Sequence, residues 1–254
     1  MVDVSGNSQT RDQEPVAVEL ERVLQLLLEG EIELHGQIPW SSNYSFLVNV
    51  QDKELSCIAV YKPQRGERPL WDFPDGTLCL REYAAFVVSQ ALGWGLVPPT
   101  VLREGPYGLG SLQLYVDADP DDHFFKLREA YPTAFQQVAV FDALVNNADR
   151  KGGHCLRDHQ GHIWCIDHGL TFNAQHKLRT VIWDYAGQPI PPDLLDDLRE
   201  LKARLRDSSE VRSVLERLLS PREMNRLQKR LDLLLETGCF PEPGAGRSVP
   251  WPLI

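Results

Sequence analysis

The chain of 254 residues is long enough for one large core or two smaller ones, and its 43% hydrophobic content is typical of a globular protein. The formal net charge of -10 argues against a general nucleic-acid binder and against constitutive docking on anionic membranes. Residues 1–14 lack the regions of a signal peptide and no apolar run is as long as a membrane span, so we expect a cytoplasmic protein without stable membrane insertion.

The first third of the chain predicts a helix followed by a meander of strands. Residues 1–14 are polar and are expected to be disordered, and residues 15–29 have the apolar face of an amphipathic helix that ends at Gly30. Strand-like runs follow at residues 32–38, 44–50 and 55–61. The turn between the first two contains Ser41, Ser42 and Asn43, which offer hydroxyl, amide and backbone donors but could equally be an ordinary turn.

A lysine and a glutamate stand at the next two element boundaries. Lys62 closes the third strand, and a helix predicted at residues 80–92 places Glu82 in its first turn, where a carboxylate suits the helix dipole. By itself, a lysine at a strand end is usually solvated. The loop between them, residues 64–77, combines charged and aromatic side chains and is typical of a lid or a substrate-contacting segment.

Two further strands and a helix are predicted before the most polar part of the chain. The strands are expected at residues 101–103 and 111–116, with a turn at residues 105–110. Residues 121–130 are expected to be a surface insertion, and Pro132 is expected to begin a helix that runs to residue 145.

Residues 146–154 form a loop of polar residues and glycines, interrupted by one alanine. Two short strands at residues 155–157 and 163–166 follow, joined by a turn. A helix, a polar loop and a hairpin bring Asp149, His154 and Asp167 to one end of a small unit. Such a set can hold a divalent cation and leave a carboxylate to orient a hydroxyl, as phosphoryl transfer requires. The alternative is a solvated loop whose Asp and Asn residues cap turns.

The remainder of the chain is predicted to be helical. Helices are expected at residues 194–205, 210–219 and 221–237, the last with a capping box from Ser220 to Glu223 and a stop at Gly238. Trp251 and Leu253 in the tail are expected to pack back on the body. The five cysteines contain no CxxC pair and are interpreted as reduced and structural.

The polar loop and the hairpin carry a family resemblance. Asp149-Arg150, a polar residue five positions after the aspartate, and Asp167-His168-Gly169 at the hairpin end resemble the catalytic and metal-binding loops of phosphoinositide 3-/4-kinase-like atypical kinases. The whole sequence is similar to an actinobacterial family of uncharacterised proteins of this type. The likeness extends over residues 27–187 and 251–253, and is carried by residues 40–43, 61–63, 65–74 and 177–180.

The resemblance implies an α+β, two-lobed atypical kinase fold with a small β-rich N-lobe and a mostly helical C-lobe. The lobes are expected at residues 15–116 and 117–243, with a tail at 244–254. It also implies binding of ATP with Mg²⁺ or Mn²⁺ and transfer of the γ-phosphoryl to a hydroxyl of an unidentified lipid, protein or small-molecule acceptor. Transfer of AMP by an inverted nucleotide is compatible with the same fold.

The resemblance assigns roles to individual residues. Asp149 is expected to orient or deprotonate the acceptor hydroxyl, with Lys151 and Arg150 as the other catalytic residues. The expected metal ligands are Asp167 and His154. The expected nucleotide contacts are Lys62, oriented by Glu82, the turn residues Ser41, Ser42 and Asn43, and the backbone of the hinge at Leu114, Tyr115 and Val116, which would face the adenine.

Two departures from the family pattern keep other functions open. His154 stands where these kinases usually carry asparagine, and imidazole suits manganese or zinc better than magnesium. The turn at residues 39–43 contains no glycine. A pseudokinase that binds a nucleotide or a partner without turnover is one alternative. A metal-dependent hydrolase built on His154, Asp167, His168 and His162 is another, although HExxH is absent.

Overall fold

The computed structural model describes residues 18–38, 43–206 and 209–254, and these residues form two compact units. Of the described residues, the first unit comprises those up to Tyr83 and Pro98–Asp117, and the second comprises those in Ala84–Val97 and Ala118–Ile254. The lobe boundary expected after residue 116 lies one residue before the boundary between Asp117 and Ala118. Residues 84–97 differ from the expectation because they group with the second unit. The expected disorder at residues 1–14, the helix start at Pro15, and Ser41 and Ser42 lie outside the described residues.

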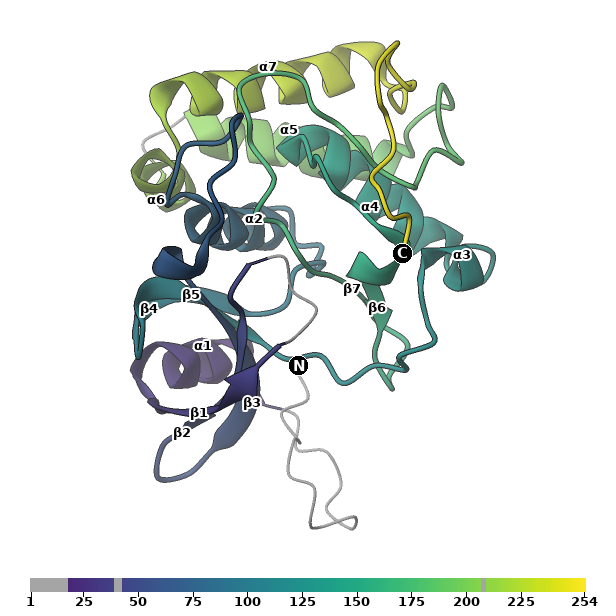
Figure 1. Ribbon diagram of the computed structural model, residues 1–254. Coiled ribbons are helices and arrows are strands. Elements are labelled where there is room, and N and C mark those ends of the chain that lie inside the picture. The colour runs from purple at the N-terminus through teal and green to yellow at the C-terminus, as the bar shows by residue number, and fades with distance from the viewer. Residues whose placement is uncertain (1–17, 39–42, 207–208) are drawn as a thin grey trace. The chain divides into compact units, whose positions relative to one another are not determined.

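The first unit contains an antiparallel sheet with the strand order β1-β2-β3-β5-β4 (Figure 1). Its elements are α1 (Leu20–Glu29), β1 (Glu31–Gln37), β2 (Phe46–Gln51), β3 (Ser56–Pro63), the 3-10 turn η1 (Gln64–Gly66), the start of α2 (Leu78–Ala91), β4 (Thr100–Gly105) and β5 (Gly108–Leu114). The meander of the first three strands is confirmed.

Helix α1 covers the sheet with its apolar stripe. Val23, Leu26 and Leu27 are buried, and the helix contacts β2, β4 and β5. The helix ends where the sequence predicted, with the Gly30 amide donating to the Leu26 carbonyl at 2.8 Å. Arg103 on β4 donates to the carbonyls of Leu27 and Gly30, at 3.0 and 2.9 Å, and so neutralises the negative end of the helix dipole.

Two local expectations in the first unit are wrong. Helix α2 begins at Leu78, so Glu82 lies beyond the first turn and gains little from the helix dipole. The Glu67 carboxylate serves that end instead by accepting from the amides of Leu78 and Cys79. Strand β5 begins at Gly108, so part of the turn expected at residues 105–110 belongs to the strand. Gly110 pairs with Pro63 in the sheet, and a glycine is needed there because a Cβ would lie 2.6 Å from the Lys62 carbonyl oxygen.

The second unit is mostly helical (Figure 1). Besides the end of α2, it contains α3 (Phe124–Leu127), α4 (Pro132–Val145), the 3-10 turn η2 (Gly152–His154), β6 (Cys155–Arg157), β7 (Ile163–Cys165), α5 (Pro192–Arg206), α6 (Glu210–Leu218) and α7 (Pro221–Thr237). Helices α4, α5 and α6 all pack on α7. Strands β6 and β7 pair as the predicted hairpin.

Most boundaries of the second unit agree with the sequence pattern. Pro132 opens α4, and the predicted capping box is confirmed, with Ser220 and Glu223 each accepting from the backbone amide of the other. Phe124 corrects the expected surface insertion, because its ring is fully buried and meets Phe135 edge-on. Trp251 corrects the expected packing of the tail, because it is 77% exposed.

The five cysteines are free, as the sequence indicated. Within residues 18–38, 43–206 and 209–254, no helix is long and apolar enough to cross a membrane.

Candidate active site

Helix α4 delivers the polar loop, and two buried asparagines fix the direction in which the loop leaves it. Asn146 adopts the left-handed conformation (φ 57°), and its side-chain amide donates to the carbonyls of Asn173 and Gln175 and accepts from the Lys177 amide. Asn147 donates to Asp142 at 2.9 Å and accepts from the amide of Asp149 at 2.9 Å. Both asparagines therefore brace the loop.

Arg150 lies fully buried at the centre of the loop. Its guanidinium contacts both oxygens of the equally buried Asp142, donates to the Ile166 carbonyl at 3.0 Å, and lies 2.7 Å from Nε2 of His168. A guanidinium enclosed in this way does not reach a substrate, so the structure does not support the expected catalytic role. Arg150 instead joins α4, the loop and the hairpin, and His168 supports the turn that follows Asp167.

Asp142 is the residue of this network that the sequence interpretation missed. It is the single charged residue of helix α4, and it accepts hydrogen bonds from Asn147 and Arg150 while its own side chain is fully buried. An acid on an apolar helix face just before a polar loop is a signal for a buried partner, because an unpaired charge is costly to bury. The two basic residues of that loop, Arg150 and Lys151, were the available partners.

The side chains of Asp149 and Lys151 remain partly accessible. Their side chains are 28% and 22% exposed, and Nζ of Lys151 lies 3.1 Å from Oδ2 of Asp149. Burial raises the pKa of Asp149 above its ordinary value, the charge of Asp167 raises it further, and Lys151 opposes both effects. The three side chains therefore interact electrostatically.

Asp167 and His154 form the second pair of the site. The hairpin places residues 155 and 165 opposite each other, which brings the residues beyond them together, and Nε2 of His154 lies 3.4 Å from Oδ2 of Asp167. The Asp167 side chain is 48% exposed, whereas that of His154 is 12% exposed. The juxtaposition of Asp149, His154 and Asp167 that the sequence predicts is therefore present.

This part of the backbone is strained. Among the described residues, the non-glycine residues with positive φ are Asn146 (57°), Asp167 (59°) and Phe172 (60°). Asn and Asp tolerate this region, whereas a bulky aromatic residue there is an outlier. Phe172 is fully buried, so the surrounding packing holds it in this conformation.

The described residues do not form a closed metal site made of protein ligands alone. Within the part of the chain that the structure describes, no group of three or more His, Cys, Asp or Glu residues is arranged to hold a metal ion alone. Magnesium keeps several waters and needs only one or two carboxylates together with phosphate oxygens, so the exposed Asp167 and neighbouring Asp149 suit it.

The proposed hydrolase set is not assembled. His162 lies 3.0 Å from the Gly95 carbonyl and packs edge-on against Trp164, while His168 is buried against Arg150. A zinc site built from His154, Asp167, His162 and His168 is therefore incompatible with this arrangement.

In the first unit, Lys62 and Glu82 form the expected pair. Nζ of Lys62 on β3 lies 2.6 Å from Oε1 of Glu82 on α2, and the two side chains are 20% and 6% exposed. The backbone amides of two residues of the expected hinge already donate within the sheet unit, Leu114 to the Pro99 carbonyl and Tyr115 to the Ile58 carbonyl. Asn43 is also engaged, because its side-chain oxygen accepts from the Arg68 amide at 2.9 Å.

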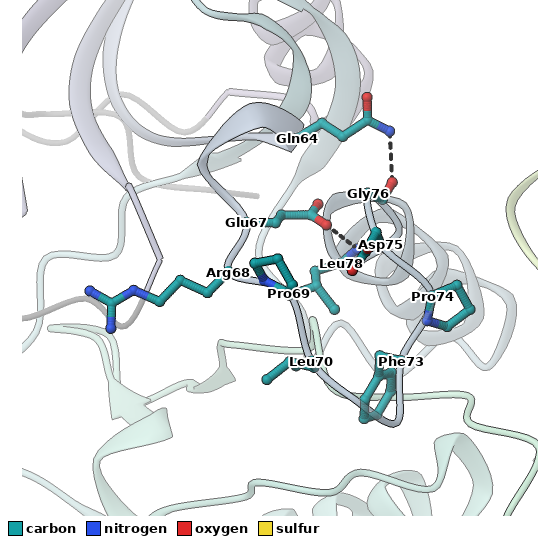
Figure 2. A pocket seen from close by; sticks show the side chains of 10 residues that line it. All are labelled: Gln64, Glu67, Arg68, Pro69, Leu70, Phe73, Pro74, Asp75, Gly76 and Leu78. Carbon is teal, nitrogen blue, oxygen red and sulfur yellow. Dashed lines mark hydrogen bonds between the residues drawn. The ribbon is translucent and has the colours of Figure 1, made fainter.

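The loop between Lys62 and Glu82 folds around a small hollow of about 200 Å³ (Figure 2). It is lined by Gln64, Glu67, Arg68, Pro69, Leu70, Phe73, Pro74, Asp75, Gly76 and Leu78. Gln64 donates to the Gly76 carbonyl at 2.7 Å and ties the two ends of the loop together. The loop is therefore an ordered structure of its own, and the hollow is separate from the Lys62–Glu82 pair, which does not line it.

Comparisons with known proteins find similar sequences. The family model described as phosphatidylinositol 3- and 4-kinase matches residues 103–237. Protein Rv2133c of Mycobacterium tuberculosis (strain ATCC 25618 / H37Rv) is 38% identical over 262 residues, which cover 89% of this chain and 94% of that protein. Phosphatidylinositol 4-kinase gamma 4 of Oryza sativa subsp. japonica is 30% identical over 145 residues, which cover 46% of this chain and 25% of the plant protein.

A solved structure is similar in fold. The structure of hydra Fam20 with sugar has a TM-score of 0.51 and 15% sequence identity, and the match covers 86% of this chain and 87% of that one. At this identity the likeness concerns the fold alone.

Proposed function

Because this chain belongs to the phosphatidylinositol 3- and 4-kinase family, we propose that it is an ATP-dependent phosphotransferase that moves the γ-phosphoryl group to a hydroxyl. Its fold is the predicted two-lobed α+β fold of atypical kinases, with an antiparallel sheet in one unit and mostly helices in the other. The observation that carries the proposal is the arrangement of the Asp149–Lys151 and His154–Asp167 pairs on one loop and hairpin.

Asp149 has the properties of the group that receives the acceptor's proton. Its carboxylate is partly exposed, and its raised pKa brings it closer to the pKa that suits a general base near neutral pH. Lys151 lies 3.1 Å away and can balance negative charge on the transferred phosphoryl group. Arg150 contributes as a positioning residue through Asp142.

Asp167, with His154 beside it, would hold the divalent cation. The ion would neutralise charge on the phosphate oxygens. The ammonium of Lys62 is suited to the nucleotide phosphates because the buried carboxylate of Glu82 holds it in place. Ser41, Ser42 and Val116 remain proposed nucleotide contacts. The acceptor is a lipid, a protein or a small molecule that carries a hydroxyl.

A nucleotide-binding protein without turnover is the second candidate. It is favoured by His154, whose imidazole occupies the position beside Asp167 where an amide oxygen is expected. Both candidates bind a nucleotide, and only the phosphotransferase also transfers the γ-phosphoryl group and forms ADP.

The test is calorimetric titration with ATP in the presence of magnesium, manganese or zinc, combined with a measurement of ADP formation in which water takes the γ-phosphoryl group in place of the acceptor. We expect Asp167→Asn to weaken metal-dependent ATP binding by at least about tenfold, because a charged metal ligand becomes neutral. Asp149→Asn should keep nucleotide binding and lower ADP formation by about 100-fold or more, as loss of a general base does. Asp196→Asn on α5, 70% exposed, removes the same charge elsewhere and is the matched control.

Each outcome separates the candidates. Metal-dependent ATP binding without ADP formation by the wild type supports the protein without turnover. Absence of ATP binding in the wild type, together with tight zinc binding, would overturn both.

A further inference from the structure

The last seven residues of the printed sequence, which we call the 248–254 segment, are attached to the candidate active site by their main chain. The carbonyl of Ser248 accepts from the amide of Thr180 at 3.0 Å and from Nε1 of Trp183 at 3.1 Å. The carbonyl of Leu253 accepts from the amide of Gly152 at 2.7 Å. Figure 1 shows the segment in yellow within the helical unit, ending close to β6 and β7.

Gly152 is enclosed between this segment and helix α3. A Cβ at position 152 would lie 3.1 Å from the ring of Phe125 and 3.4 Å from the Leu253 carbonyl oxygen. A Cβ at Gly153 would lie 3.6 Å from the side chain of Ile254. These two glycines separate Lys151, which pairs with Asp149, from His154, which pairs with Asp167. The 248–254 segment therefore contacts the loop midway between the two functional pairs.

The other end of the segment reaches the same loop through Thr180. The amide of Arg150 donates to the Arg179 carbonyl, and the amide of Val181 donates to the Arg150 carbonyl, so residues 179–181 lie alongside the loop. The hydrogen bonds from Thr180 and Trp183 to the Ser248 carbonyl attach residues 179–181 to the 248–254 segment. Main-chain bonds thus link the segment to both sides of the loop.

We propose that the 248–254 segment is a positioning element of the active site, in which the Leu253 carbonyl fixes the Gly152–Gly153 stretch and thereby the spacing of the Asp149 and Asp167 carboxylates. This inference rests on the proposed function. Adjacent glycines have the largest backbone entropy to lose, so this stretch needs an external partner to hold one conformation. The hydrogen bond that attaches the segment to Gly152 is made by the main-chain carbonyl of Leu253, while the side chains of Trp251 and Leu253 are 77% and 38% exposed.

The test compares the chain of 254 residues with a variant that ends at Pro250 and with Leu253→Ala. The shortened variant loses the Leu253 carbonyl but keeps Ser248, and Leu253→Ala keeps the carbonyl while removing an exposed side chain. Amide hydrogen exchange at Gly152 and Gly153 is followed by NMR, and ATP affinity is measured with and without magnesium. In the shortened variant we expect exchange at Gly152 to rise by about tenfold or more, as loss of a loop hydrogen bond allows.

In the same variant, the factor by which magnesium increases ATP affinity should fall by about tenfold. The ATP affinity without metal and the melting temperature should stay near those of the wild type. Leu253→Ala should match the wild type in every measurement. Unchanged exchange and unchanged magnesium dependence in the shortened variant would overturn the proposal, and so would an equal loss in Leu253→Ala. If the wild type binds no ATP, the proposed function has failed, and the exchange rates alone decide whether the segment holds the loop.

Discussion

At the scale of the residue, Asp149 shows how one carboxylate is tuned by opposing effects. Partial burial and the nearby charge of Asp167 disfavour its ionised form, and Lys151 favours it. The net result is a raised pKa, which means that the folded protein holds the Asp149 proton more tightly than the unfolded chain does. The ionised form therefore lowers the stability of the fold as the pH rises through this pKa.

The exchange of Asp149 for asparagine should consequently stabilise the protein at neutral pH in metal-free buffer. Asparagine has a similar shape and never carries the charge that the folded state disfavours. The gain should shrink as the pH falls through the raised pKa of Asp149, because wild-type Asp149 then becomes neutral as well. Thermal unfolding at several pH values measures the effect. Asp196→Asn should show no such pattern, and a lower melting temperature for Asp149→Asn at pH 7 would contradict the interpretation.

The sequence was informative about residues that lie close together along the chain. Asp149, His154 and Asp167 are separated only by a short loop and a hairpin, so the strand pattern alone brings them together. The sequence could not show that Arg150 is buried while Lys151 is exposed, because both are basic neighbours in one polar loop. That difference depends on Asp142, which belongs to another element and to the core.

At the scale of the element, the Arg150–Asp142 ion pair joins α4, the loop and the hairpin. Both side chains are fully buried, so each charge depends on the other for compensation. Loss of one partner leaves an unpaired charge in the core. The pair therefore holds the loop against α4.

We expect Arg150→Met to lower the free energy of unfolding by about 3–5 kcal/mol, the usual cost of breaking a buried ion pair from one side. Urea unfolding followed by circular dichroism gives the value. The double variant Arg150→Met with Asp142→Leu should recover part of the loss, since it removes the orphaned charge as well. A loss below about 1 kcal/mol in the single variant would show that the pair contributes little, as exposed pairs do.

Periodicity predicted most elements, and the errors have physical causes. Periodicity works where an element buries one face only, because the apolar residues of that face then recur at a fixed spacing in the sequence. This is the case for the helices α1, α5 and α7 and for the strand β3. Helix α3 was missed because it has only four residues, and its burial depends on Phe135 in the next helix. The start of α2 was misplaced because its first amides are capped by Glu67, which lies far outside the helix.

At the scale of the whole molecule, the acidic charge adds a repulsion that no single contact reports. The net charge of -10 disfavours the compact state, because folding brings like charges closer together. Salt weakens such repulsion, since the Debye length falls to about 10 Å at 0.1 M ionic strength.

The melting temperature should therefore rise when sodium chloride is raised from about 20 mM to about 200 mM. For a protein of this size, each kcal/mol of added stability raises the melting temperature by about 2–4 °C, so we expect a shift of a few degrees. Differential scanning fluorimetry at pH 7 measures the shift. The effect should decrease near the isoelectric point, where the repulsion has largely gone. A melting temperature that falls with salt at pH 7 would instead indicate that surface ion pairs dominate.

The left-handed residues at positions 146, 167 and 172 also have a consequence for protein engineering. Substitutions that relax the backbone at these positions are an obvious route to a more robust protein, since each non-glycine residue there stores conformational energy. At Phe172 this route is closed, because glycine would also empty a fully buried ring position, at a larger cost. Phe172 will therefore keep its left-handed conformation in more robust variants of the protein, because the packing of its ring outweighs the conformational energy that it stores.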